Sequence, residues 1–140
     1  MRYWGKRSME VYHTLHPTLQ HYVNRVRDEV ADISLICGYR DEEAQNKAFD
    51  GGFSKVRWPH GNHNKLPSTA VDIQPVIASK AKIKLSTNLS YIAGRFVEMA
   101  KADGVTIRWG GDWDQDGDLT DQTFDDLFHF ELVENNNNDT

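Results

Sequence analysis

Residues 126–132 read Asp126-Leu127-Phe128-His129-Phe130-Glu131-Leu132. Apolar and polar side chains alternate along this stretch, which is typical of a β-strand with one face in the core. The aromatic and aliphatic side chains would face the core, and His129 would face a cleft on the other side. We therefore predict a strand over residues 127–133 whose polar face carries a candidate metal ligand.

Upstream of this strand, short apolar segments alternate with helical patterns. Pro17 suits the first turn of a helix, and Gly104 suits the residue just after one. We expect helices over residues 17–31, 41–49 and 89–103, with Asn88 as the N-cap of the last. We expect further strands over residues 33–39, 70–73 and 105–109. This mixture predicts an α+β fold, a single domain over residues 1–134 with helices packed on a small, mainly antiparallel sheet, and a polar tail over residues 135–140.

Composition narrows the classes of function. The chain has 140 residues, with 16 Lys and Arg against 21 Asp and Glu, which gives a formal net charge of −5. Nucleic-acid binding is not expected, because phosphate neutralisation needs clustered basic residues. No apolar run approaches the ~20 residues that span a bilayer, so no membrane insertion is expected, and no secretory signal is visible. Cys37 is the single cysteine, so it has no internal disulfide partner, and its apolar neighbours favour a buried, unreactive thiol.

Two histidines and one carboxylate form a candidate zinc site. The ligands would be His63, Asp72 and His129. Three protein ligands leave a fourth position open, which is typical of a catalytic rather than a structural zinc site. Asp126 lies three residues before His129 and could serve as a general base. The pattern favours a zinc hydrolase.

An acidic loop precedes the last strand. Carboxylates at alternate positions, followed by Gly117, match the front of a calcium-binding EF-hand loop. The twelfth position is Thr123 instead of the usual Glu, so a solvated acidic loop is the alternative. The candidate calcium ligands are Asp112, Asp114, Asp116 and Asp118.

Five segments together carry a resemblance to a known family. They are Gly38-Tyr39-Arg40 with Gln45, then Gly52-Phe53-Ser54, then residues 63–75, then Trp109-Gly110-Gly111-Asp112-Trp113, and finally residues 126–132. In this order and spacing, the chain resembles zinc peptidases of the D-Ala-D-Ala carboxypeptidase superfamily. More closely, it is similar to the small phage endolysins that act as L-alanyl-D-glutamate peptidases.

The resemblance implies a role for each matching residue. It implies Asp126 as the general base and Arg40 as the arginine that contacts substrate and stabilises the oxyanion or a carboxylate. It also implies a cleft lined by Gln45 and Ser54, regulatory calcium in the acidic loop, and zinc held by His63, Asp72 and His129.

The implied function is lysis of bacterial cell walls by hydrolysis of the L-Ala–D-Glu bond in peptidoglycan stem peptides. The expected protein is a monomer that is made in the host cytoplasm and reaches the wall after a holin permeabilises the membrane. A D,D- or L,D-carboxypeptidase acting on the same peptides is the alternative within the enzyme class. A non-catalytic wall-binding or calcium-binding module is the alternative from another class, and a metal-dependent nuclease is disfavoured by the acidic charge.

Overall fold

The structure is a computed structural model, and it describes residues 3–78, 80–120 and 126–134. Its elements follow the chain in the order α1 (Lys6–Tyr12), α2 (Pro17–Glu29), β1 (Ile33–Cys37), α3 (Glu42–Asp50), η1 (Asn62–Asn64), β2 (Ala70–Pro75), α4 (Leu85–Ala102), β3 (Thr106–Gly110) and β4 (Asp126–Val133). The predicted tail over residues 135–140 lies outside the described residues.

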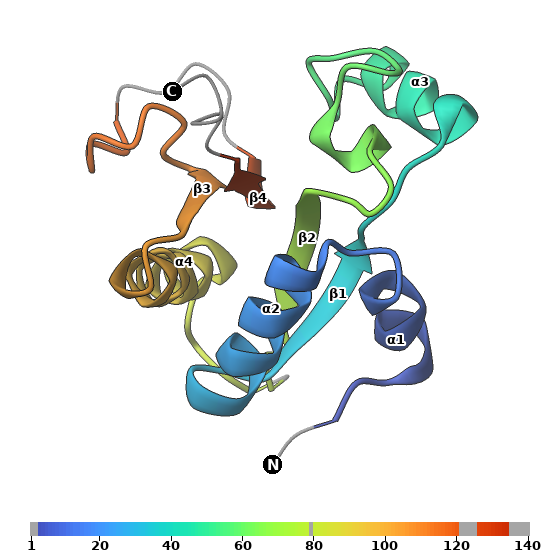
Figure 1. Cartoon of the computed structure of the whole chain (residues 1–140). Coiled ribbons are helices and arrows are strands. Elements are labelled where there is room, and N and C mark those ends of the chain that lie inside the picture. Colours follow the sequence, from blue (N-terminus) through green and yellow to red (C-terminus); the bar gives the residue numbers. More distant parts are fainter. Residues whose placement is uncertain (1–2, 79, 121–125, 135–140) are drawn as a thin grey trace.

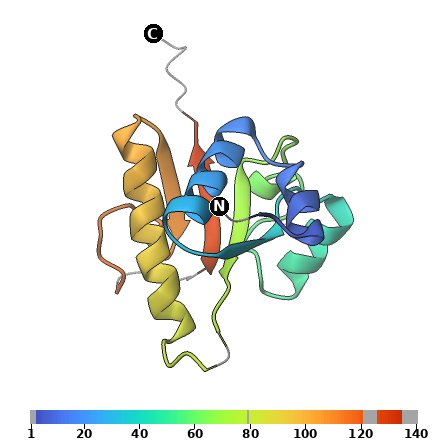
Figure 2. The same cartoon turned by 90° about the horizontal axis from the view of Figure 1, so that it is seen from below.

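The four strands form one sheet in the order β1-β2-β4-β3, and every neighbouring pair is antiparallel. The helices α2 and α4 lie together on one face of this sheet, and α3 stands beyond the ends of β1 and β2, away from α4 (Figures 1 and 2). The prediction of an α+β fold with a small antiparallel sheet is confirmed. Within the described residues, no helix has the length and apolar character needed to cross a membrane.

The core lies between the sheet and the two long helices. Phe96 of α4 stacks on Phe130 of β4 with ring centroids 4.9 Å apart, and both side chains are fully buried. The side chain of Phe130 therefore points from one face of β4 into the core, as the alternating pattern of the strand predicts. The opposite face of the same strand is left for polar side chains.

Several elements differ from the sequence prediction, and three of the differences have a clear physical reason. Helix α1 was not predicted, because its seven residues carry no long apolar stripe. Helix α4 begins at Leu85 instead of after Asn88, whose backbone N–H already donates to the Lys84 carbonyl at 3.1 Å. Strand β2 continues to Pro75, which pairs with Ile33 at the end of the ladder, where a missing N–H does little harm.

Candidate metal centre and active-site cleft

The three predicted metal ligands come from three separate elements and meet at one end of the sheet. His63 lies in η1, Asp72 in β2 and His129 in β4. Asp72 and His129 are direct partners in the β2–β4 ladder, so their side chains share a face. The His63 Nε2 atom lies 3.3 Å from His129 Nδ1 and 3.3 Å from Asp72 Oδ1, and His129 Nδ1 lies 3.5 Å from the same oxygen.

Nε2 of His63, Oδ1 of Asp72 and Nδ1 of His129 form a triangle, called here the metal triangle, which has the dimensions of a zinc-binding site. Ligands at about 2.0–2.1 Å from a tetrahedral ion lie about 3.3 Å from one another. Asp72 Oδ1 is buried and accepts no hydrogen bond from the described residues, so it is an orphaned acceptor that points into the triangle. The donor set and its spacing therefore fit zinc.

The two imidazoles present opposite ring nitrogens to this triangle. Nδ1 of His63 lies 2.7 Å from the Gly38 carbonyl oxygen, and Nε2 of His129 lies 2.7 Å from Oε1 of Glu131. Because a carbonyl and a carboxylate only accept, these two nitrogens must carry the protons. The remaining nitrogens, Nε2 of His63 and Nδ1 of His129, are free to bind a metal.

Asp72 and each of the two histidines shift each other's pKa values toward the charged forms. Burial alone would lower the pKa of both His63 and His129, but neighbouring acidic groups outweigh it and raise both. For His63 these groups are the Asp72 carboxylate and the Cys37 thiol, and for His129 they are the carboxylates of Asp72 and Glu131. Burial would raise the pKa of Asp72, yet the two histidines hold it below its usual range. An ion that neutralised Asp72 would therefore displace protons from the imidazoles.

Asp126 lies just outside the ligand triangle. Its Oδ2 atom is 4.0 Å from His129 Nδ1, at the first residue of β4. Burial raises its pKa, and repulsion from Asp72 adds to that rise. A carboxylate with a raised pKa beside an open metal position has the properties of a general base.

Arg40 is held beside the same centre. Its Nη2 atom lies 3.6 Å from Oδ2 of Asp72, and its Nη1 atom donates to Oε1 of Gln45 at 3.0 Å. Gln45 is 1% exposed and also bonds Asn64, Ser54 and the Val56 carbonyl. All the hydrogen-bonding capacity of Gln45 is used within the protein, so it orients Arg40.

The hydroxyl of Ser54, like the amide of Gln45, is hydrogen-bonded within the protein. Its Oγ atom accepts from Gln45 Nε2 at 2.9 Å and lies 3.2 Å from both the Val56 N–H and the Val56 carbonyl. Both Gln45 and Ser54 line the cleft, as predicted. Their direct contact with substrate stays a prediction.

A cavity of about 540 Å³ opens over the metal triangle. Its lining includes Arg40 and Gln45, from the segment after β1 and from α3, together with Arg108 of β3, Trp113 of the loop after β3, and Glu131 of β4. The Trp113 ring lies 5.3 Å from the His129 ring. A cavity of this size takes a short peptide segment.

The sequence prediction gave no role to three of the residues that line the cavity: Arg108, Trp113 and Glu131. Glu131 is 4% exposed and pairs across the sheet with Arg108, whose Nη2 and Nε both bond Glu131 Oε2. The signal for Glu131 was present, because it lies two residues after His129 and so must share its face of the strand. The signal for Arg108 was absent, since it depends on the register of β3 against β4.

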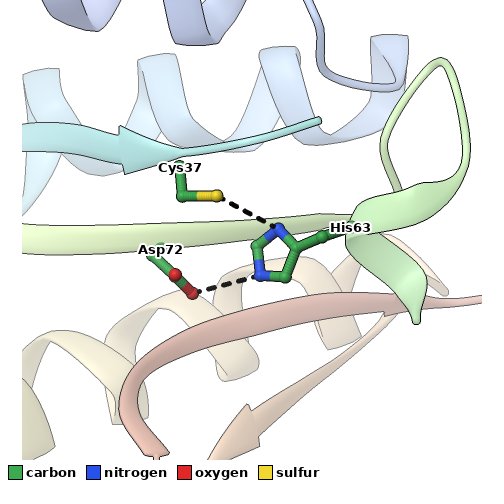
Figure 3. A group of neighbouring side chains, drawn as sticks. All are labelled: Cys37, His63 and Asp72. Carbon is green, nitrogen blue, oxygen red and sulfur yellow. Dashed lines mark hydrogen bonds and ion pairs between the residues drawn. The ribbon is translucent and has the colours of Figure 1, made fainter. Parts of the chain in front are cut away.

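Cys37 lies behind His63 instead of in the metal triangle. Its Sγ atom is 3.8 Å from His63 Nδ1, the nitrogen that donates to Gly38 (Figure 3). Figure 3 shows Cys37 and Asp72 at opposite nitrogens of the same ring. One donor atom from each of Cys37, His63 and Asp72 lies within 4.8 Å of the other two. The thiol is half-buried and not fully buried as predicted; burial would raise its pKa, but the hydrogen bond with His63 outweighs burial and lowers it. The unreactive thiol stays a prediction.

In the acidic loop after β3, aspartate side chains accept hydrogen bonds from backbone N–H groups of the same loop. The backbone N–H of Gly117 donates to Asp112 Oδ2 at 3.0 Å, and that of Asp116 donates to Asp114 Oδ1 at 3.3 Å. One carboxylate oxygen from each of Asp112, Asp114 and Asp116 lies within 4.8 Å of the others, and Asp112 Oδ1 is buried without a hydrogen-bond partner among the described residues. Asp118 is outside that group and instead caps Thr120.

The twelfth position of the candidate calcium loop, Thr123, lies outside the described residues. Partial desolvation and the hydrogen bond with Asp116 raise the pKa of Asp114. A hard cation such as calcium would remove the repulsion between carboxylates that lie this close together.

Two comparisons with known proteins give a match, and a third gives none. The sequence model of a family described as phage L-alanyl-D-glutamate peptidase matches residues 1–133 of the chain. Among solved structures, the L-Ala D-Glu endopeptidase ChiX of Serratia marcescens superposes with a TM-score of 0.70 at 24% sequence identity, over 91% of this chain and 87% of that one. At that identity the likeness establishes the fold. No curated protein matches the chain.

Proposed function

Since the chain belongs to the phage L-alanyl-D-glutamate peptidase family and is an enzyme that hydrolyses peptidoglycan, we propose that it is a zinc-dependent endolysin that cuts the L-Ala–D-Glu bond of the stem peptide. The proposed peptidase domain spans residues 1–134. The proposed zinc ligands are His63, Asp72 and His129, with Asp126 as the general base.

One observation supports the zinc assignment most strongly. Three donor atoms from η1, β2 and β4 stand 3.3–3.5 Å apart, and one of them is a buried carboxylate oxygen without a hydrogen-bond partner among the described residues. A structural hydrogen-bond network would satisfy that oxygen. A cation would satisfy it together with both imidazole nitrogens.

Each group at the proposed zinc site has a separate role in peptide hydrolysis. When bound, zinc supplies a Lewis acid that lowers the pKa of a water and polarises the scissile carbonyl. Asp126 accepts the proton of the attacking water and delivers it to the leaving amine. Arg40, fixed by Gln45, stabilises the negative charge that develops on the carbonyl oxygen.

Calcium is proposed as a regulator of the same enzyme. Asp112, Asp114 and Asp116 would supply the ligands, with Asp118 at the edge of the loop. Trp113 lies between the first two of these residues and packs against His129, so an ordered loop would hold one side of the metal centre. Without the usual Glu at the twelfth position, we expect an affinity on the order of 10⁻⁴ M.

The remaining assignments follow from the family and the charge. The partner is bacterial peptidoglycan and not nucleic acid, which suits the formal net charge of −5. We propose a monomer that acts on the wall after a holin permeabilises the membrane.

Digestion of purified peptidoglycan tests the function. The zinc-loaded protein should release fragments with a new amino group on D-Glu and leave L-Ala at the end of the muramyl peptide, as measured by mass spectrometry. Asp126→Asn serves as the matched inactive control, because it keeps the size of the side chain. Release of terminal D-Ala alone would favour the carboxypeptidase alternative, and no cleavage would favour a binding module.

A further inference from the structure

Arg40 and Arg108 are the two arginines among the described residues that line the cavity. Arg108 lies in β3, directly opposite Glu131 in the β3–β4 ladder. Its side chain is 35% exposed, whereas that of Glu131 is 5% exposed. The guanidinium therefore stands at the surface of the cavity, and the carboxylate that holds it lies beneath.

The ion pair leaves most of the guanidinium free to bind a ligand. A guanidinium has five N–H groups. Glu131 Oε2 takes one from Nε and one from Nη2, and Glu131 Oε1 is already occupied by His129. No other hydrogen bond to Arg108 is present among the described residues, so its Nη1 group keeps its donors for a ligand in the cavity that Arg108 lines. The guanidinium carbon of Arg108 lies over the Trp113 ring, 6.0 Å from its centre.

The two arginines of the cavity have different environments. Arg40 contacts Asp72 at the metal triangle and is bonded to buried Gln45, which places it beside the reacting carbonyl. Arg108 is separated from the metal-facing imidazole by Glu131, so it lies further from the reacting carbonyl. A substrate group that meets Arg108 must therefore flank the scissile bond.

We infer that Arg108 is a specificity residue that binds the α-carboxylate of the D-Glu residue, an inference that rests on the proposed function. D-Glu in the stem peptide is linked onward through its side chain, so its α-carboxylate is free and lies next to the scissile amide. A planar guanidinium with an open edge binds such a carboxylate through paired hydrogen bonds. Arg40 then remains for the oxyanion.

A pair of substrates that differ only in this group tests the inference. The zinc-loaded enzyme is assayed on a soluble muramyl peptide with D-Glu and on the same peptide with the α-carboxylate amidated. Wild type should prefer the acid, and Arg108→Gln should lower kcat/KM for the acid by about 10-fold to 100-fold, mainly through KM. The amide should lose no more than about threefold. Arg95→Gln on the outer surface of α4 is the matched control.

Zinc content is measured for each variant, so that a loss of metal through Glu131 is recognised. Arg108→Lys provides a second variant that keeps the charge beside Glu131 but lacks the fork, and it should retain an intermediate preference for the acid. An unchanged acid-to-amide preference in both zinc-replete variants would overturn the inference. If wild type cleaved neither peptide, the proposed function itself would fall.

Discussion

Glu131→Gln is the substitution that tests how the metal centre is held. Glu131 accepts from His129 Nε2 at 2.7 Å and pairs with Arg108. Burial would raise its pKa, but these two partners outweigh burial and lower the pKa from 4.5 to about 2 in the metal-free protein. Glutamine keeps the shape of the side chain and removes the charge, so both partners lose their anion.

The lowered pKa of Glu131 sets an upper bound on the effect. A pKa of about 2 in place of 4.5 corresponds to at most roughly 3 kcal/mol of stability, and little of this is screened by solvent because the side chain is 5% exposed. In a chain of this size that is a fall in Tm of up to about 10 °C. Because a carboxylate that orients a ligating histidine also tunes the metal, zinc affinity should fall by about 10-fold to 100-fold.

The pH dependence has a defined sign. The pKa of Glu131 is depressed by folding, so its contribution is complete above a pH of about 4.5 and is lost as the pH falls toward 2. The Tm difference between wild type and Glu131→Gln should therefore be largest near neutral pH and shrink in acid. The assays are calorimetry of the metal-free proteins across this range and competition for zinc with a chelating dye. Glu134→Gln, at an exposed neighbour, is the control, and equal behaviour of the two variants would refute the reasoning.

Three further outcomes are expected. His63→Ala and His129→Ala should each lose bound zinc together with lytic activity, as measured by metal analysis and a turbidity assay; an active, metal-free variant would exclude the zinc assignment. Asp126→Ala should keep zinc and lose about 10²–10⁴-fold in turnover, whereas loss of the metal would make Asp126 a ligand. The double variant Asp114→Ala, Asp116→Ala should lack the calcium-dependent rise in Tm expected of wild type, and a wild type that does not respond to calcium would leave the loop a solvated acidic turn.

The sequence predicted the residues of the metal triangle but not how they meet. Histidine and carboxylate side chains are common metal ligands, so their residue types alone make them candidates. The alternation along β4 places His129 on the polar face of the strand. The pairing of Asp72 with His129 depends on the register of β2 against β4, which is fixed by the packing of the whole sheet. Local pattern carries no information about that register.

The roles of Gln45 and Ser54 show a different limit. Both were predicted to line the cleft, and both do. Their polar atoms, however, bond each other, Arg40 and the backbone of Val56, and these partners come together only when α3 and the following loop fold. A sequence shows that a polar side chain is available for substrate, but it does not show whether the fold has already used it.

Trp113 connects the two candidate metal sites, and thermodynamics constrains what that connection can do. The residue belongs to the acidic loop, and its ring packs on His129 and faces Arg108. If calcium in the loop tightens zinc binding by some factor, zinc must tighten calcium binding by the same factor. A calcium titration with and without zinc therefore measures the coupling from either side. Equal calcium affinities in the two titrations would mean that calcium stabilises the loop only locally, and would exclude coupling through the contact between Trp113 and His129.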